Sequence, residues 1–263
     1  MKKGIIFING HLGLKILDFL YKDPEFDILA VVVNATVKRR KGYIQEILNL
    51  TNPSIRIFET SRELWQDIDF IQVTKLADFG ISSLYGHVIP AFFIENLEFK
   101  ILNLHPSLLP IGRGSDPIPW TIIEGKKHGI TLHEITSELD EGPIIFQREL
   151  AIDMSMTAGA IYNLSINKLF EDFTRIFQNW VDGKILGTKQ KSEPTYHKTA
   201  DLFNLRKSLA KDATHFEYLI RVLRALTFSN NLRPILKFSD GIAWEVEVII
   251  KRHNNLEEEI NDL

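Results

Sequence analysis

Runs of apolar residues alternate with amphipathic stretches through the first half of the chain. The apolar runs read as strands buried on both faces, at residues 5–8, 26–33, 55–58, 79–84 and 100–104. Between them, apolar positions recur at helical spacing, most clearly over residues 14–21 and 43–50. Strands with two apolar faces that alternate with helices are typical of a parallel sheet covered on both sides. We therefore expect an α/β fold with a doubly wound, mostly parallel sheet.

The pattern changes after residue 105. A loop rich in proline and glycine leads to two further predicted strands at 129–135 and 144–150, and then to a long helix at 158–181. A polar stretch at 188–199 is typical of a linker. After it we expect a small extension made of a helix at 214–226 and a β-hairpin, because Asp240-Gly241 favours a tight turn. The predicted domains are residues 1–187 and the extension 188–263.

Composition and charge exclude several classes of protein. The 263 residues are 44% hydrophobic and 25% charged, which is ordinary for a soluble globular protein. The net charge is −3, whereas a protein that grips a long nucleic acid through its phosphates is normally basic, so we expect no nucleic-acid partner. The absence of cysteine excludes disulfides and thiolate chemistry. The apolar run at 4–8 is too short for a signal peptide, and the run at 28–33 is too short for a membrane helix. We expect a cytoplasmic protein without membrane insertion.

Candidate chemistry lies where the predicted strands end. Ligands of open parallel sheets bind beyond the carboxyl ends of the strands, which selects the loops 9–13, 85–90 and 103–113. Asn103 and His105 are two residues apart, so their side chains point the same way. Asp140 lies in a separate turn that can close on the same point. An amide that stabilises an oxyanion, an imidazole that takes a proton and a carboxylate that orients it suit acyl transfer to an amine.

The same region resembles the folate-dependent formyltransferases. The resemblance rests on six groups of residues: Asn103-Leu104-His105-Pro106-Ser107-Leu108-Leu109-Pro110, Arg113-Gly114, Trp120, Gly125, Gly129-Ile130-Thr131-Leu132-His133 and Leu139-Asp140-Glu141-Gly142. It implies a Rossmann-like core and a catalytic set of Asn103, His105 and Asp140. It also implies N10-formyltetrahydrofolate as co-substrate, without a metal. The pterin is expected to bind backbone groups of one loop, Tyr85, Gly86, His87, Val88 and Ile89, and of the turn that contains Asp140, Glu141 and Gly142.

Within this family the chain is most similar to the sugar-nucleotide N-formyltransferases. Its extension is shorter than that of a methionyl-tRNA formyltransferase, and residues 224–228 resemble a segment of the sugar enzymes, although Ser229-Asn230-Asn231 departs from their pattern. We therefore expect a nucleotide-linked amino sugar as acceptor, dTDP-4-amino-4,6-dideoxyglucose or a 3-amino analogue. A methionyl-tRNA formyltransferase-like enzyme and a formyltetrahydrofolate hydrolase stay as alternatives. The expected substrate contacts are Asn9, Gly10, His11, Arg113 and Trp120.

Four features have two interpretations each. The pair Gly10 and Gly13 fits the start of a helix better than a dinucleotide-binding loop, because the third glycine is missing. His133 is either a packed side chain or part of the site. The basic run 38–41 is either a solvated loop or a contact for phosphates or the glutamate tail of the folate. The C-terminal hairpin, with Trp244, either stays exposed or pairs in a homodimer, which we expect.

Overall fold

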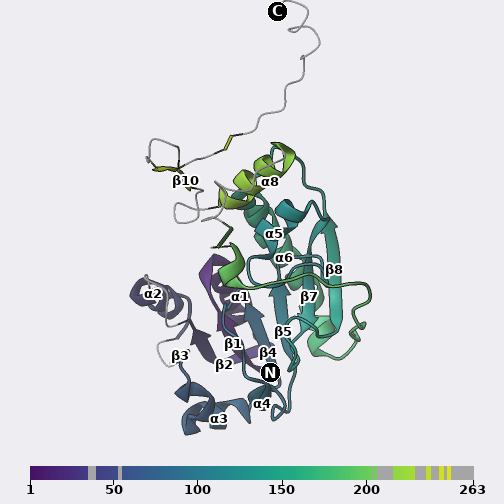
Figure 1. Cartoon of the computed structure of the whole chain (residues 1–263). Helices are drawn as coiled ribbons and strands as arrows, with labels where there is room; N and C mark the ends of the chain where they lie inside the picture. The colour runs from purple at the N-terminus through teal and green to yellow at the C-terminus, as the bar shows by residue number, and fades with distance from the viewer. Residues whose placement is uncertain are drawn as a thin grey trace, which may run out of the picture.

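The computed structural model describes residues 1–34, 40–52, 55–202, 204–205, 216–228, 235–237, 243–245 and 248–249. A seven-stranded sheet runs through the middle of the molecule in the order β3-β2-β1-β4-β5-β7-β8 (Figure 1). Five strands are parallel, namely β1 (Lys2–Ile8), β2 (Phe26–Val33), β3 (Arg56–Glu59), β4 (Phe79–Ser83) and β5 (Ile101–His105). The last two, β7 (His128–Glu134) and β8 (Ile144–Leu150), are antiparallel. The prediction of a doubly wound, mostly parallel sheet is confirmed.

Alternate side chains of each strand build a separate core on each face of the sheet. Ile6 and Ile8 of β1 belong to a cluster with α1 (Gly10–Lys22), α2 (Arg40–Leu50) and α6 (Ala158–Val181). Ile5 and Phe7 belong to a cluster on the other face, with η1 (Glu63–Gln66), α3 (Ile68–Thr74) and α4 (Ala91–Ile94). This two-sided burial explains why the strands read as continuous apolar runs.

A third cluster joins the end of the chain to the rest of the molecule. It contains α5 (Pro117–Glu124), the first turns of α6 and α8 (Phe216–Leu226). The side chain of Arg224 is almost fully buried, and its guanidinium donates to the carbonyl oxygens of Asp153 and Met156. The helix of the predicted extension is therefore anchored to the sheet domain.

The C-terminal hairpin is present as β10 (Ile235–Lys237) paired antiparallel with β11 (Ala243–Glu245). The turn at 239–241, the residues 38 and 39 of the basic run, the segment 229–231 and the last residues of the chain lie outside the described residues. So do the side chains on which the expected dimer contact depends, and the homodimer stays a prediction. Among the described helices, none is both long and apolar enough to cross a membrane.

The polar stretch at 188–199 is bonded to the sheet domain along much of its length. Thr188 forms a bridge with Ile144, and β9 (Tyr196–His197) pairs in parallel with β6 (Arg113–Gly114). The backbone N–H of Gly112 also donates to Thr195 Oγ1, at 2.8 Å. The segment that looks like a linker in the sequence therefore runs beside the loop that follows β5. The domain boundary at residue 187 stays a prediction.

Candidate active site

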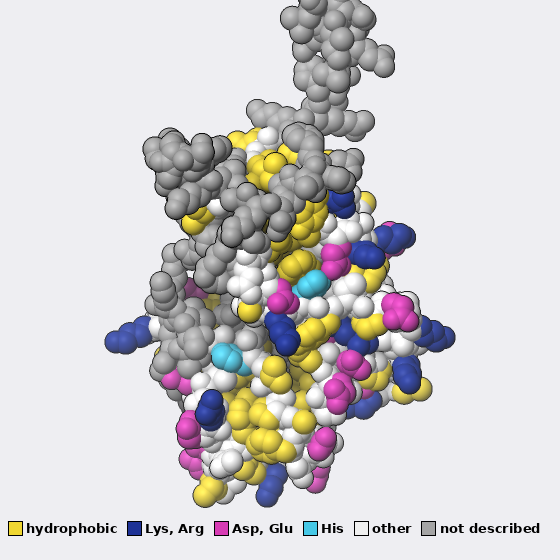
Figure 2. Space-filling view, viewed as in Figure 1, with side chains coloured by type: hydrophobic (Ala, Val, Ile, Leu, Met, Phe, Trp, Pro, Cys, Tyr) yellow, Lys and Arg dark blue, Asp and Glu magenta, His cyan; other side chains and the backbone are white. Residues whose placement is uncertain are grey.

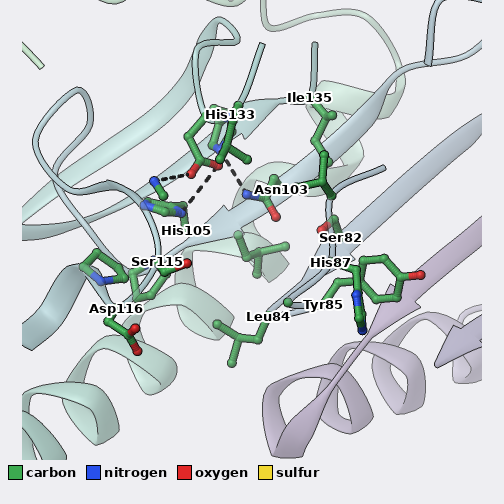
Figure 3. A pocket seen from close by; sticks show the side chains of 18 of the residues that line it. Ser82, Leu84, Tyr85, His87, Asn103, His105, Ser115, Asp116, His133 and Ile135 are labelled. Atoms are coloured by element: carbon green, nitrogen blue, oxygen red, sulfur yellow. Dashed lines mark hydrogen bonds and ion pairs between the residues drawn. The ribbon is translucent and has the colours of Figure 1, made fainter. Parts of the chain in front are cut away.

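Asn103 and His133 are direct partners in the antiparallel pairing of β5 with β7. Their side chains point toward one another (Figure 3), and Asn103 Nδ2 lies 3.0 Å from His133 Nε2. His133 Nδ1 lies 3.0 Å from the carbonyl oxygen of Glu134, which can only accept, so Nδ1 carries the ring proton. Nε2 is therefore the acceptor, and the Asn103 amide nitrogen donates to it. The orientation of the Asn103 amide is fixed by this chain of two bonds.

His105 is buried at the end of β5, between two acceptors. Its Nε2–H donates to the carbonyl oxygen of Gly112 at 2.8 Å, which leaves Nδ1 as the free nitrogen. Nδ1 lies 3.8 Å from Asp140 Oδ1. A positively charged ring would meet an acceptor at each nitrogen, so the surroundings suit a histidine that takes up a proton during a reaction.

Asp140 comes from the turn between β7 and β8 and adopts the left-handed conformation, with φ 54°, which aspartate tolerates better than most residues. Its Oδ2 accepts the backbone N–H of Gly114 at 2.9 Å, and its Oδ1 lies 3.6 Å from His133 Nε2. Gly114 must be a glycine, because a Cβ there would come within 2.3 Å of the His197 carbonyl oxygen. The carboxylate is thus held at one oxygen and directs the other toward both imidazoles.

Burial is the main factor that lowers the pKa of His133, followed by the charge of His105. The nearby Asp140 carboxylate acts in the opposite direction but does not outweigh these two effects. His133 is therefore neutral at neutral pH, as its acceptor role toward Asn103 requires. The interpretation of His133 as part of the site fits this geometry better than simple packing.

A cavity of about 480 Å³ opens in front of these residues, a size typical of small-molecule sites. Asn103, His105, His133 and Asp140 all line it. Ser115 and Asp116 lie on the side of His105, and Tyr85 and His87 lie on the opposite side (Figure 3). The cavity therefore has two ends with the polar cluster between them.

The predicted pterin loop lines this cavity along its whole length, from Tyr85 to Ile89. The turn contributes Thr136 to Asp140, whereas Glu141 and Gly142 do not line the cavity. Glu141 instead accepts a bond from Arg113 Nη1 at 2.5 Å. Gly142 packs against β7, where a Cβ would come within 1.7 Å of the Glu134 carbonyl oxygen.

The predicted substrate contacts are not among the residues that line this cavity. Asn9 precedes α1, and Gly10 and His11 lie in the first turn of that helix. This agrees with the interpretation of Gly10 and Gly13 as the start of a helix. None of these three residues lines the cavity. Trp120 stacks on His197 with ring centroids 3.8 Å apart, and it does not line the cavity either.

Arg113 also differs from its expected role. Its guanidinium donates through Nη1 to Glu141 and through Nε and Nη2 to Gln190 Oε1. A phosphate contact would have to replace these three bonds. The expectation that Arg113 contacts the diphosphate or the sugar stays a prediction.

Ligand atoms of His105, His133 and Asp140 lie within 4.8 Å of one another, a spacing that could accommodate a metal ion. The Nε2 lone pair of His133 is already used by Asn103, so a metal ion would have to break that bond. The prediction of a metal-independent enzyme stays open to a direct test.

Two residues of the site region, Asp116 and Gln190, are not predicted from the sequence. Asp116 lines the cavity with φ 54°, and burial raises the pKa of its carboxyl group. Gln190 bonds the turn of Asp140 from the polar stretch after α6. Asp116 follows Arg113-Gly114 closely and could have been suspected from that position, but no local signal marks Gln190.

The chain is similar to known proteins in sequence and in fold. The formyl transferase family matches residues 21–168. A dTDP-4-amino-4,6-dideoxyglucose formyltransferase from Mycobacterium bovis is 33% identical over 156 residues, which are 59% of this chain and 66% of that protein. A methionyl-tRNA formyltransferase from Mycoplasma pneumoniae is 28% identical over 203 residues, 74% of this chain and 64% of that protein. The chain thus spans just under two thirds of the length of these relatives.

Solved structures match over more of the length. A sugar N-formyltransferase from a Shewanella species has a TM-score of 0.80 and 20% identity, and the match covers 97% of this chain and 99% of that one. The formyltransferase PseJ from Anoxybacillus kamchatkensis has a TM-score of 0.54 and 26% identity, with 73% and 98% covered. Since the family match covers more than half of the chain, the protein belongs to the formyl transferase family.

Proposed function

We propose that the protein moves a formyl group from N10-formyltetrahydrofolate to the amine of a nucleotide-linked amino-dideoxy sugar. The observation that carries this proposal is the meeting of an amide, an imidazole and a carboxylate, from Asn103, His105 and Asp140, in the middle of a two-ended cavity. Two substrates that enter from opposite ends would meet at this cluster.

The donor is assigned to the end formed by residues 85–89. This end offers loop backbone together with the side chains of Ile89 and Ile94, which suits a flat pterin with polar edges. A neighbouring structure, that of PseJ, is in complex with tetrahydrofolate, which supports a folate donor here.

Asn103 is assigned to the carbonyl oxygen of the formyl group. One N–H of its amide is used by His133, which leaves the second N–H to stabilise negative charge as the amine attacks. An amide already held in place needs no reorientation during the reaction, and this preorganisation is what makes such donors effective.

His105 is assigned to the proton. The attacking nitrogen forms its bond to the formyl carbon, the bond from that carbon to N10 breaks, and tetrahydrofolate leaves. The amine attacks in its neutral form, after its ammonium form has released one proton to solvent. The proton that the attacking nitrogen then loses passes to His105 Nδ1, and His105 gives it to N10. The Asp140 carboxylate lies 3.8 Å from His105 Nδ1 and stabilises the charged imidazole while it carries the proton.

The charge of the cavity favours an amine as acceptor. Three carboxylates line it, from Asp116, Glu138 and Asp140, and the described lining residues include neither lysine nor arginine. A primary amine is largely protonated at neutral pH, so this lining attracts it. The same charge repels phosphates, so the diphosphate of the acceptor must lie beyond the described lining.

An amino-sugar nucleotide is favoured over a tRNA as acceptor. The relative from Mycobacterium bovis acts on a dTDP-linked amino sugar, and PseJ is in complex with a UDP-linked formamido sugar. The net charge of −3 does not suit a tRNA. On the face that Figure 2 shows, the described Lys and Arg side chains are interspersed with Asp and Glu and form no continuous basic patch.

The test is an acceptor panel with N10-formyltetrahydrofolate as donor. We expect tetrahydrofolate to form when dTDP-4-amino-4,6-dideoxyglucose or its 3-amino analogue is added. Equal turnover without an acceptor would identify a hydrolase, and turnover only with methionyl-tRNA would identify the tRNA enzyme. Either result contradicts the proposal.

We also assign residues 1–187 to the catalytic domain and 188–263 to an extension that joins two copies in a homodimer. Phe228 of this extension lines the cavity and packs against Tyr162, with ring centroids 5.2 Å apart. Light scattering on the purified chain tests the homodimer, and a monomeric mass contradicts it.

A further inference from the structure

Gln190 lies under the turn that carries Asp140 and uses its whole side-chain amide there. Its Nε2 donates to the carbonyl oxygens of Asp140 and Gly142, at 2.7 and 2.9 Å. Its Oε1 accepts from Arg113 Nη2 and Nε, at 2.8 and 3.2 Å. An amide has two N–H donors and two acceptor lone pairs, so every hydrogen-bonding position of Gln190 is filled.

These bonds close a ring around the Asp140 turn. Arg113 continues the ring by donating to Glu141, the residue that follows Asp140. Gly114, next to Arg113, donates its backbone N–H to the Asp140 carboxylate. The side chain of Asp140 is therefore bonded to Gly114, and its backbone is linked to Arg113 through Gln190.

The turn needs such support, because Asp140 holds a left-handed backbone conformation that costs free energy for a residue other than glycine. Glu141 and Leu139, on either side of Asp140, are both exposed and contribute little packing. A displacement of about 1 Å at a catalytic group can cost up to about a hundredfold in rate. The position of Asp140 therefore depends on bonds from outside the turn.

We propose that Gln190 is a positioning residue of this formyltransferase: it holds the turn of Asp140 so that the carboxylate stays directed at His105. Arg113 supports the turn in the same way, through its bonds to Gln190 and Glu141. The inference rests on the catalytic role that the proposed function gives to Asp140. It extends the functional unit beyond the residues 21–168 of the family match, into the segment that reads as a linker.

Three variants separate the contributions of the bonds that Gln190 makes. Gln190→Ala removes all four bonds. Gln190→Glu has nearly the same shape and keeps two acceptors for Arg113, but it cannot donate to the carbonyl oxygens of Asp140 and Gly142. The matched control is Lys191→Ala, because Lys191 is the exposed neighbour on the same segment.

We expect kcat to fall about ten- to a hundredfold in both Gln190 variants, with KM for donor and acceptor within about threefold of wild type. This split is expected because Gln190 does not line the cavity. The control is expected to keep wild-type kcat. A kcat within about twofold of wild type in either Gln190 variant, or a loss confined to KM, would overturn the proposal.

A double-variant cycle asks whether Gln190 acts through Asp140. In an Asp140→Asn background, the further change Gln190→Ala is expected to lower kcat by less than about threefold, because the group it positions is already gone. A loss as large as in the wild-type background would contradict action through Asp140.

Hydrogen exchange gives a readout that needs no substrate. Mass spectrometry of peptides covering residues 138–143 is expected to show faster deuterium uptake in Gln190→Ala than in Lys191→Ala, with unchanged uptake in β1 and β4. Unchanged uptake at 138–143 would overturn the proposal. A wild-type protein that formylates none of the acceptors would instead contradict the proposed function and leave this exchange test intact.

Discussion

The side chain of Asn103 is tied to the backbone of β7 through the imidazole of His133. Asn103 Nδ2 donates to His133 Nε2 at 3.0 Å, and His133 Nδ1 donates in turn to the Glu134 carbonyl oxygen at 3.0 Å. The second bond selects the tautomer that accepts the first one. A neutral, buried histidine thereby determines which end of the Asn103 amide faces the reaction.

The first prediction concerns the hydrogen bond from Asn103 to His133. His133→Phe removes the acceptor and frees the Asn103 amide to flip, so we expect kcat to fall about tenfold to a hundredfold. His133→Gln supplies a carbonyl oxygen that can accept the same bond, and we expect it to recover part of the loss. Steady-state kinetics of the two variants checks this, and equal activity of both variants would contradict it.

The second prediction concerns the two residues closest to the reaction. Asn103→Ala removes the oxyanion donor, and His105→Ala removes the group that takes the proton. We expect each to lower kcat at least about a hundredfold. Folate binding, followed by fluorescence titration, is expected to survive because the donor end is built from residues 85–89. Wild-type activity in either variant would refute the assignment.

The third prediction follows from the close packing of Gly142. A Cβ at this position would come within 1.7 Å of the Glu134 carbonyl oxygen, so Gly142→Ala must displace β7 or the Asp140 turn. We expect a loss of about 1–3 kcal/mol in the free energy of unfolding, together with reduced kcat. Gly42→Ala on α2 is the control, because nothing lies within 4 Å of a Cβ there. Similar urea midpoints for the two variants would speak against this account.

The fourth prediction concerns acid stability. Burial, and next the charge of His105, lowers the pKa of His128 to about 4. Its Nε2–H donates to Ser165, and its Nδ1 is buried without a hydrogen-bond partner, so a proton at Nδ1 would meet no acceptor. The unfolded chain binds this proton near pH 6.5 and the folded one only near pH 4.

Stability is therefore expected to fall as the pH drops from about 6.5 to about 4, by about 3 kcal/mol for this one group, and to level off below that. His128→Gln keeps the donor to Ser165 but does not titrate, so its urea-unfolding free energy is expected to depend less on pH. The same pH slope in wild type and variant would rule out His128 as the cause.

The fifth prediction concerns metal ions. If His105, His133 and Asp140 work as a proton-transfer cluster, prolonged dialysis against a chelator is expected to leave kcat unchanged. Added Zn²⁺ is expected to inhibit, because the ligand atoms of these residues lie within 4.8 Å of one another. Activity that is lost with the chelator and restored by a metal ion would show that the enzyme needs one.

Local patterns in the sequence carry most of the fold. The strands of the sheet read as apolar runs because both of their faces are buried, and the spacing of Asn103 and His105 already places them on one side of β5. The antiparallel pairing of β7 with β5 and of β8 with β7 has no such local signal, since strand direction depends on how the chain returns to the sheet.

The contacts of Gln190 and Arg113 also have no local signal in the sequence. Gln190 lies in a polar stretch whose composition is that of a linker. The bridge of Thr188 with Ile144 and the pairing of β9 with β6 bring it beneath Asp140. Arg113 looks like a phosphate ligand in the sequence because arginine commonly binds phosphates, but its partners Glu141 and Gln190 are remote along the chain. Contacts of this kind depend on tertiary structure and cannot be read from spacing.

Transfer of an isotope-labelled formyl carbon tests the central claim most directly. The donor would be N10-formyltetrahydrofolate labelled at the formyl carbon, and the acceptor dTDP-4-amino-4,6-dideoxyglucose, with the product analysed by mass spectrometry and NMR. We predict that the label appears as a formamide on the sugar nitrogen with the wild-type protein, and at least about a hundredfold more slowly with Asn103→Ala. Label released as free formate, or a sugar formylated equally fast by Asn103→Ala, would contradict it.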